Sequence, residues 1–349
     1  MCELLGMSFN QPVKPTLSFR GFRHGGENNP HGWGLAYYPD ISVQVIKEPI
    51  KASGSSLSEF IKNYQQIKSR IFISHVRYTS VGEKSHKNTH PFQRELNGRD
   101  FVFAHNGTLH NYRGLSTGRF KPVGKTDSEY VFCHIINRIE ERNINNIWTS
   151  KHFRWLWDQL KTVNNNGKFN CVFSDGEHLF CYYDKGGYNG LCFVHRKAPF
   201  NTVRLADEDF EINLSEEKEP SQKGFIIATR RLTNERWENF NPEELIVFKS
   251  GDIIFSSSGR DTGSFQTSPN EKELSTLRVL RQSPHRVSLI NIYQRLNSPK
   301  EEITPAIHSL LCKGFIKQDS RDRVKWDHDD ATYYTESSKS EEIDGLIGE

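Results

Sequence analysis

A cysteine directly follows the initiator methionine, and this position gives its thiol an unusual chemical option. If Met1 is removed, Cys2 carries a thiol and a free α-amino group on one residue. Such an amine has a pKa of about 7.7–8.0, so it can take the proton of the thiol and return it to a leaving amine. Cys2 could then attack an amide without a separate histidine base. The alternative is that Met1 is retained and Cys2 is a small buried residue of a first strand.

Ordered motifs accompany Cys2, and together they are far more specific than any one of them alone. The motifs are Met1-Cys2-Glu3-Leu4-Leu5-Gly6-Met7-Ser8, Gly32-Trp33-Gly34, His75-Val76-Arg77-Tyr78-Thr79-Ser80-Val81-Gly82, Phe103-Ala104-His105-Asn106-Gly107-Thr108-Leu109 and Thr126-Asp127-Ser128-Glu129. With these motifs the chain resembles the class II glutamine amidotransferases, whose nucleophile is an N-terminal cysteine, and most closely their stand-alone YafJ-like branch. The resemblance covers about the first three quarters of the chain.

The resemblance implies an α+β chain with the four-layer α/β/β/α fold of N-terminal-nucleophile hydrolases, built on antiparallel sheets over residues 2–262. It also implies an enzyme that hydrolyses the γ-amide of glutamine, or a related γ-glutamyl bond, through a thioester on Cys2. Glutamate and ammonia, or an amine, would be released without any cofactor. Relatives normally pass ammonia to a synthase domain, and nothing after residue 265 is long enough to be one. The partners expected are therefore a small-molecule substrate and a separate synthase or acceptor protein.

The resemblance places an oxyanion hole at Asn106 and at the backbone N–H of Gly107, which would also line the substrate site. Loss of one such donor typically removes about 3 kcal/mol of transition-state stabilisation. Asn-Gly between two strands is also the strongest signal for a type I′ hairpin turn. Both interpretations can hold, because a turn would fix the two donors rigidly.

Two charged residues match the positions that bind the ends of the substrate in this family. Arg77 matches the clamp on the α-carboxylate, for which a planar guanidinium offers two parallel hydrogen bonds. Asp127 matches the carboxylate that receives the α-ammonium group. The alternatives are an ordinary ion pair for Arg77 and, for Asp127, a place in a helix capping box that begins at Thr126.

One position departs from the family pattern, because His31 stands where the branch usually has an acidic residue before Gly-Trp-Gly. Substrate choice near this loop is therefore open. Five histidines crowd the stretch from 75 to 110, but no thiol or carboxylate has the spacing of a metal ligand, so we expect no metal site. The remaining cysteines lie in apolar patterns and are expected to be inert core thiols: Cys133, Cys171, Cys181, Cys192 and Cys312.

Composition limits the remaining possibilities. The 349 residues carry 46 Lys and Arg against 43 Asp and Glu, so the net charge of +3 gives no general affinity for nucleic acid or membranes. Apolar runs fall far short of the roughly 20 residues that cross a bilayer. The first residues have neither a basic leader nor an apolar segment with a cleavage site, so we expect a cytoplasmic protein without membrane association. Self-association stays open.

Short strands and amphipathic helices must position these residues. Hairpin-linked strands with few helices favour antiparallel sheets flanked by helices. Three helices are predicted from their 3.6-residue period, each burying one stripe: Leu57/Phe60/Ile61/Tyr64, Tyr130/Val131/Ile135/Ile139 and Phe153/Leu156/Trp157/Leu160. Strands are predicted at 34–38, 71–76, 101–104, 171–174, 179–183, 225–229 and 245–248.

A second module is predicted after a linker at 260–270. Its three helices would carry Leu274, Leu277 and Leu280, then Leu289, Ile292, Tyr293 and Leu296, then Ile303, Ile307, Leu310 and Leu311, with Gly314 as the last C-cap. A hairpin of 315–317 and 323–326 would follow, so residues 271–328 resemble a winged helix. The acidic segment 331–349 has few apolar residues, and we expect it to be disordered.

This module suggests a different function class, a regulator that senses a metabolite and binds DNA or a protein partner. Residues 271–328 hold eleven Lys and Arg against seven Asp and Glu, and Arg321, Arg323 and Lys325 would lie on the wing. The third helix, however, begins with Glu301 and Glu302, which would repel a phosphate backbone. Protein docking or dimerisation is therefore favoured over DNA binding. An inactive scaffold is disfavoured, because Cys2 and all four partner residues are present.

Overall fold

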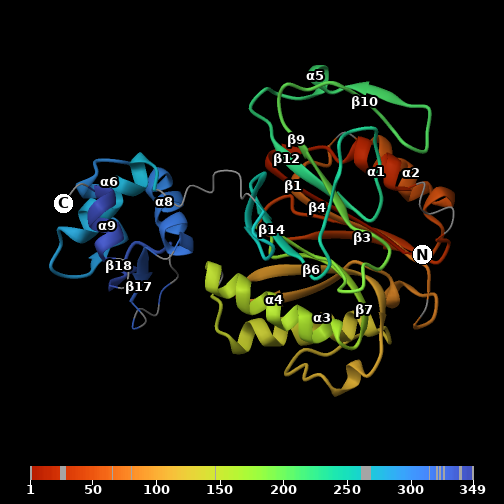
Figure 1. Cartoon of the computed structure of the whole chain (residues 1–349), viewed down its shortest axis with the longest axis horizontal. Helices are drawn as coiled ribbons and strands as arrows, with labels where there is room; N and C mark the ends of the chain where they lie inside the picture. The colour runs from red at the N-terminus through yellow and green to blue at the C-terminus, as the bar shows by residue number, and fades with distance from the viewer. Residues whose placement is uncertain are drawn as a thin grey trace. The chain divides into compact units, whose positions relative to one another are not determined.

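A computed structural model describes residues 2–23, 29–64, 66–79, 81–145, 147–260, 269–313, 315–319, 321, 324, 327–337 and 340–347. The chain forms two compact units, which are drawn in Figure 1. The first unit takes Met1–Asn143 with Leu156–Gly263, and the second takes Ile144–Trp155 with Ser264–Glu349. Among the helices described, none has both the length and the apolar character that crossing a membrane requires.

Two antiparallel sheets form the centre of the first unit. The seven-stranded sheet has the order β13 (Glu238–Asn239), β9 (Cys192–Arg196), β12 (Gly224–Ala228), β1 (Glu3–Val13), β4 (Ser69–Val76), β2 (Trp33–Tyr37) and β3 (Gln44–Glu48). The six-stranded sheet has the order β15 (Asp252–Ser256), β14 (Leu245–Lys249), β8 (His178–Tyr182), β7 (Gly167–Ser174), β6 (Arg99–Leu109) and β5 (Phe92–Leu96).

Helices cover the outer face of each sheet (Figure 1). Side chains alternate along β1, so that Leu4 packs between the sheets while Leu5, Met7 and Phe9 pack on the helix side. The predicted helix–sheet–sheet–helix arrangement is thus present. The helices are α1 (Thr16–Arg23) and α2 (Ser56–Asn63) on one side and α3 (Asp127–Glu141) and α4 (Ser150–Asn164) on the other. Shorter elements are β10 (Thr202–Arg204), β11 (Glu211–Asn213), α5 (Leu214–Glu217), η2 (Ala52–Gly54), η3 (His86–Asn88) and η4 (Tyr112–Gly114).

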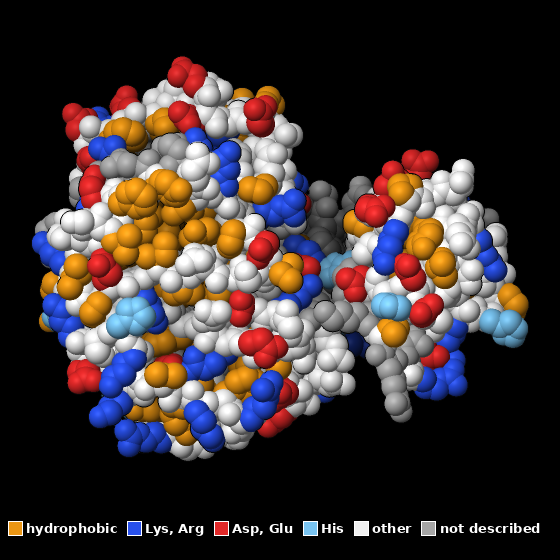
Figure 2. Space-filling model, turned by 180° about the vertical axis from the view of Figure 1, so that it is seen from behind, with side chains coloured by type: hydrophobic (Ala, Val, Ile, Leu, Met, Phe, Trp, Pro, Cys, Tyr) orange, Lys and Arg blue, Asp and Glu red, His pale blue; other side chains and the backbone are white. Residues whose placement is uncertain are grey.

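All seven predicted strands and the three predicted helices of this unit form, but α2 does not bury the stripe expected of it. Ile61 is buried, whereas Leu57, Phe60 and Tyr64 are 38%, 57% and 40% exposed. Only a narrow face of α2 packs against the sheet. The regular spacing of its apolar residues therefore predicted a wider buried face than the helix has. Figure 2 shows hydrophobic side chains gathered on one face of this unit.

The second unit builds its own core from helices and a small sheet. The three predicted helices form, and the described part of the chain packs Leu277, Leu289, Ile307, Tyr333 and Ile343 together. Its sheet has the order β16, β18, β17. The elements are α6 (Glu271–Arg281), β16 (Val287–Ser288), α7 (Leu289–Arg295), α8 (Lys300–Lys313), β17 (Ile316–Gln318), β18 (Thr332–Thr335) and α9 (Ser340–Ile347).

β17 pairs with β18, whereas residues 323, 325 and 326 of the second strand predicted at 323–326 lie outside the described residues. One prediction for this unit is wrong. The segment 331–349, expected to be disordered, supplies β18 and α9, because Tyr333, Ile343 and Ile347 each find a place in the core. The core therefore extends beyond the predicted boundary at 328. Gly314 and most of the predicted linker at 260–270 lie outside the described residues.

Candidate active site

Cys2 lies at the beginning of β1, in the middle of the seven-stranded sheet. The strand pairs with β4 and β12, with Leu4 opposite His75 and Leu5 opposite Ala228. The Cys2 Sγ accepts a hydrogen bond from the Tyr78 N–H at 3.0 Å and lies 3.1 Å from the Tyr78 carbonyl, to which the thiol donates. The thiol therefore rests on the backbone of the segment that follows β4.

The electrostatic surroundings of Cys2 keep its thiol protonated. Burial raises the pKa of the thiol above its usual value. The Tyr78 N–H and the positive charges of the amino terminus and Arg77 act in the opposite direction but are smaller. A nucleophilic role thus requires a base that removes the proton at the moment of attack.

Two asparagine amides hold the carbonyl group of Cys2. The Asn106 Nδ2 donates to this oxygen at 2.5 Å, and the Asn189 Nδ2 donates to it at 2.8 Å. Asn106 comes from β6, and Asn189 comes from the loop between β8 and β9, where its φ of 56° is left-handed. Asn189 was not among the predicted site residues, and the sequence signals it only by the Gly- and Asn-containing segment around it.

The Asn106–Gly107 pair lies inside a strand, so the predicted hairpin turn is wrong. Asn106 pairs with Asn170 and Gly107 pairs with Phe169 in the ladder between β6 and β7. Gly107 has a φ of +154°, and a Cβ atom there would lie 2.0 Å from the Lys168 carbonyl oxygen. Only glycine fits this backbone position.

Arg77 is 3% exposed and directs its guanidinium toward the following loop. It donates to the carbonyl oxygens of Val81 at 3.0 Å and Glu83 at 3.2 Å. Burial lowers the pKa of this guanidinium, and its Coulombic interactions with Asp127 and with the thiolate form of Cys2 oppose the change. Because its acceptors here are neutral carbonyls, its positive charge is available to an anionic group.

Asp127 occupies the first position of α3 and is 3% exposed. Its Oδ2 accepts the Leu109 N–H at 2.7 Å, which ties the beginning of the helix to the end of β6. Half of the predicted capping box is present, because the Thr126 Oγ1 accepts the Glu129 N–H. The Glu129 carboxylate instead accepts the N–H groups of residues 123 and 124 and pairs with the guanidinium of residue 94.

His31 supports the segment that holds Cys2. Its Nδ1 accepts the Thr79 N–H at 2.9 Å, and its ring lies 5.0 Å from that of Tyr78. Burial, followed by the charges of Lys84 and Arg77, lowers the pKa of this imidazole, which favours the neutral form that can accept a hydrogen bond. The residue that departs from the family pattern thus contacts the backbone beside the nucleophile.

Three histidines are buried behind the site. The rings of His75 and His90 lie 4.2 Å apart, and none of their nitrogens has a hydrogen-bond partner among the described residues. His105 contacts the Ser128 hydroxyl and the Lys168 carbonyl. Burial lowers the pKa of all three, that of His75 to about 3. Within the described part of the chain, no three His, Cys, Asp or Glu residues are grouped to hold a metal ion.

The other cysteines for which side chains are described are buried, as expected of inert core thiols. They are Cys133, Cys171, Cys181 and Cys192.

Comparisons with known proteins agree with this geometry. Residues 1–273 match the family model described as "Glutamine amidotransferases class-II". The chain is 47% identical over 351 residues to the Methanocaldococcus jannaschii protein MJ1515, covering 99% of this chain and 96% of that one. It is 38% identical over 262 residues to Escherichia coli YafJ, whose name assigns it provisionally to the glutamine amidotransferases; the match covers 73% of this chain and 100% of YafJ.

A solved structure shows the same fold. The crystal structure of a predicted glutamine amidotransferase from Pseudomonas aeruginosa is similar with a TM-score of 0.56 and 31% identity, covering 73% of this chain and 100% of that one. The chain therefore belongs to the class II glutamine amidotransferases, and its first unit has their fold, which resembles that of N-terminal-nucleophile hydrolases. The full-length match to MJ1515 includes the second unit, whereas YafJ is too short to contain it.

Proposed function

We propose that this protein hydrolyses the γ-amide of glutamine, or a related γ-glutamyl bond, with Cys2 as nucleophile after removal of Met1. The observation that carries the proposal is the contact between Cys2 and Asn106, in which an amide donor from within β6 reaches the backbone of the thiol-bearing residue at the beginning of β1. The raised pKa of the thiol fits a mechanism in which the freed α-amine acts as the base.

The reaction follows from these groups. The α-amine of Cys2 takes the thiol proton while the sulfur bonds to the γ-carbonyl carbon, and the carbonyl oxygen becomes negative. The proton then passes to the leaving nitrogen, the C–N bond breaks and ammonia or an amine departs. Water, deprotonated by the same amine, attacks the thioester, and the C–S bond breaks to release glutamate.

The oxyanion would be stabilised by Asn106 and Gly107. The Asn106 amide has two N–H donors and gives one to the Cys2 carbonyl, so a second donor is available to the developing charge. The Gly107 N–H is the other donor in this proposal. Both residues belong to β6, which is held between β5 and β7. Because the strand fixes the two donors, they need not move as negative charge develops on the oxygen.

Arg77 and Asp127 are proposed to bind the α-carboxylate and the α-ammonium group of the substrate. Both are buried, Arg77 interacts electrostatically with Cys2 and with Asp127, and each already has hydrogen bonds that fix its orientation. The Asp127 Oδ2 accepts the Leu109 N–H, and its Oδ1 accepts the Ser128 hydroxyl at 3.4 Å, so the remaining lone pair of Oδ1 is the proposed acceptor for an ammonium group.

Glutamate release tests this proposal. The purified full chain is incubated with glutamine and with a panel of γ-glutamyl amines and peptides, and glutamate is measured. We expect release from at least one compound, its loss in Cys2→Ala, and its retention in Cys192→Ala, which removes a buried thiol on β9. Equal release by Cys2→Ala would contradict the proposal, and the preferred compound would identify the leaving group.

We propose further that the second unit is a winged-helix-like module that docks a protein, such as the acceptor of the ammonia. The order α6, β16, α7, α8, β17, β18 supports the resemblance. No observation favours DNA binding, and six of the basic side chains described in this unit are paired with carboxylates. Ion pairs engage Lys272, Arg281, Arg286, Lys300, Lys317 and Arg321 with Glu302, Asp344, Asp319, Asp329 and Glu336, Asp319 serving two of them.

A further inference from the structure

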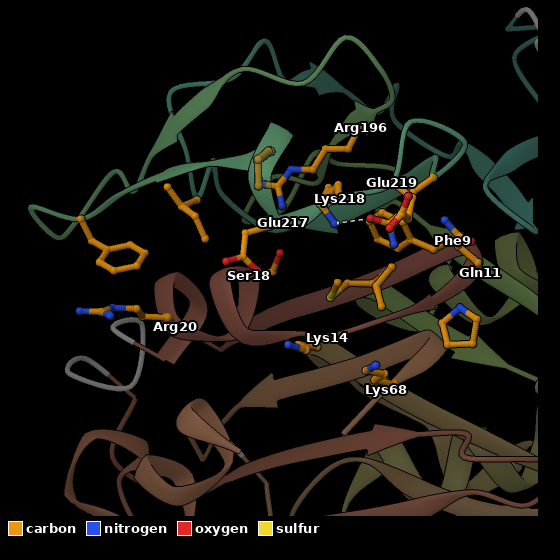
Figure 3. Close-up of a pocket in the computed structure, with 17 residues that line it drawn as sticks. Phe9, Gln11, Lys14, Ser18, Arg20, Lys68, Arg196, Glu217, Lys218 and Glu219 are labelled. Atoms are coloured by element: carbon orange, nitrogen blue, oxygen red, sulfur yellow. Dashed lines mark hydrogen bonds between the residues drawn. The ribbon is translucent and has the colours of Figure 1, made fainter. Parts of the chain in front are cut away.

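A second cavity lies at the opposite end of β1 from Cys2. Its volume is about 450 Å³, which is within the range of small-molecule sites. Residues from Met7 to Lys14 form one wall, and residues from Phe210 to Gln222 form another (Figure 3). At about 3.3 Å per strand residue, Phe9 is roughly 20 Å from Cys2. The cavity is therefore separate from the candidate active site.

The floor of this cavity is apolar. Met7, Phe9 and Val13 reach it from β1, on the face that packs toward the helices. Phe210, Ile212 and Leu214 line it from β11 and the beginning of α5. An apolar body placed here would be removed from water on two sides, which favours binding by about 25 cal/mol per Å² of buried apolar surface.

The polar part of the wall is mostly basic. Two of the lining cations have carboxylate partners, since Arg20 pairs with Glu208 and Arg196 pairs with Glu235. Two carboxylates also line the cavity and reduce its positive charge. The charged lining residues are Lys14, Arg20, Lys68, Arg196 and Lys218, with Glu217 and Glu219.

Lys218 differs from Arg20 and Arg196 because the hydrogen-bond acceptor described for it is a neutral amide oxygen. Its Nζ donates to the Gln222 Oε1 at 2.9 Å and lies 5.2 Å from the Phe9 ring centre. Burial, followed by the charge of Arg196, lowers the pKa of this ammonium group to about 8, against the influence of Glu217 and Glu235. An anion beside Lys218 would relieve this unfavourable burial.

A second donor in the cavity wall is unmatched. The Gln11 Nε2 is buried and has no hydrogen-bond partner among the described residues. A buried donor of this kind is costly unless an acceptor reaches it. Gln11 and Lys218 thus require the same chemistry, an oxygen acceptor with negative charge, next to an apolar floor.

We propose that this cavity binds an organic carboxylate with an apolar body, its carboxylate oxygens accepting from Lys218 and Gln11 and its body lying on Met7, Phe9 and Val13. The site lies outside the γ-glutamyl chemistry of Cys2. The inference does not depend on that activity.

Calorimetric titration of the full chain with three probes tests the assignment. Decanoate has both features, decanol has the body without the charge, and inorganic phosphate has charge without a body. We expect decanoate to bind at least about tenfold more tightly than either of the other two. No decanoate binding, or equal binding of decanoate and decanol or of decanoate and phosphate, would overturn the proposal.

Variants locate the binding. Lys218→Met keeps the apolar stem and should weaken decanoate about tenfold while leaving decanol unchanged. Gln11→Leu should weaken decanoate several-fold. Lys151→Met removes an exposed lysine of α4 and is the matched control, expected to bind as the parent does. Unfolding curves confirm that each variant is folded. Parent-like decanoate binding by folded Lys218→Met would contradict the assignment.

Discussion

The two ends of β1 differ in how their polar groups are satisfied. At the Cys2 end, the thiol contacts the Tyr78 backbone and the Cys2 carbonyl accepts from two asparagine amides. At the other end, the Gln11 amide has a donor without a described partner, and Lys218 has only a neutral one. One strand thus supports a site whose geometry is fixed and a site whose donors are unmatched. Substitutions should therefore lower the free energy of unfolding strongly at the Cys2 end and only slightly at the cavity end.

The largest effect is expected for Gly107→Ala. The added Cβ atom would lie 2.0 Å from the Lys168 carbonyl oxygen and 2.8 Å from the His105 Nε2, so β6 and β7 must separate. We expect the free energy of unfolding to fall by about 4 kcal/mol and glutamate release to be lost. Urea unfolding measures the first quantity and the glutamate assay the second.

Gly54→Ala is the control, because a Cβ atom there meets nothing within 4 Å. It should change the free energy of unfolding by no more than about 0.5 kcal/mol. Equal stability of the Ala variants at 54 and 107 would show that the backbone beside Cys2 is not constrained as described.

The next effect separates the two amides that hold the Cys2 carbonyl. Asn106→Ala should lower kcat by a factor of about 100 to 1000, because it removes an oxyanion donor as well as a contact. Asn189→Ala removes only a positioning contact, worth about 1 kcal/mol, so a loss of about tenfold or less is expected. Steady-state kinetics of both variants measure the two losses in kcat. Equal losses would mean that Asn106 also acts only by positioning.

The strands of the first unit could be predicted from the sequence more fully than the contacts around Cys2. Runs of β-branched and aromatic residues were enough to find every strand predicted for the first unit, because both faces of these strands are largely buried. They could not show that Asn106 and Gly107 lie within β6, because pairing along β7 overrides the local turn preference of Asn-Gly. Asn189 was invisible because its role depends on a loop that meets Cys2 only in the folded chain.

In the second unit, the helices could be predicted but the structure of the C-terminal segment could not. Its helices followed from their periodic leucines and isoleucines, but its C-terminal segment was judged by composition. Tyr333, Ile343 and Ile347 are few in number, yet each is buried in the unit's core. Composition is an average over the whole segment. A short strand or helix can pack against a core with only a few apolar residues, provided that these lie on the face that meets the core.

An effect that depends on pH rather than on one substitution, spread over the first unit, concerns acid stability. The pKa of buried His75, His90 and His105 is lowered in the folded chain, so the unfolded chain binds their protons first as the pH falls below about 6.5. The free energy of unfolding should then fall by about 1.4 kcal/mol per pH unit for each histidine. Most carboxyl groups titrate below pH 5, so a change in stability between pH 6.5 and 5 reports mainly on histidines.

Urea unfolding at pH 7.5, 6 and 5 measures this slope. His90→Leu should reduce the proton uptake on unfolding by about one proton. Stability that does not change between pH 6.5 and 5 would mean that these histidines are not held neutral.

The smallest effect is expected at the cavity end of β1. Gln11→Leu removes a buried donor that has no described partner, so the free energy of unfolding should stay within about 1 kcal/mol of the parent's value, or rise. The same urea unfolding experiment measures it. A loss comparable to that of Gly107→Ala would remove the contrast between the two ends.

Covalent labelling tests the central claim, that the sulfur and the α-amine of Cys2 act together, most directly. The full chain is treated with a diazoketone analogue of glutamine and analysed by intact mass and peptide mapping. The account predicts one adduct on Cys2 in a chain that lacks Met1, and none on Cys2→Ala. An adduct at any other residue, or glutamate release by a chain that retains Met1, would contradict it.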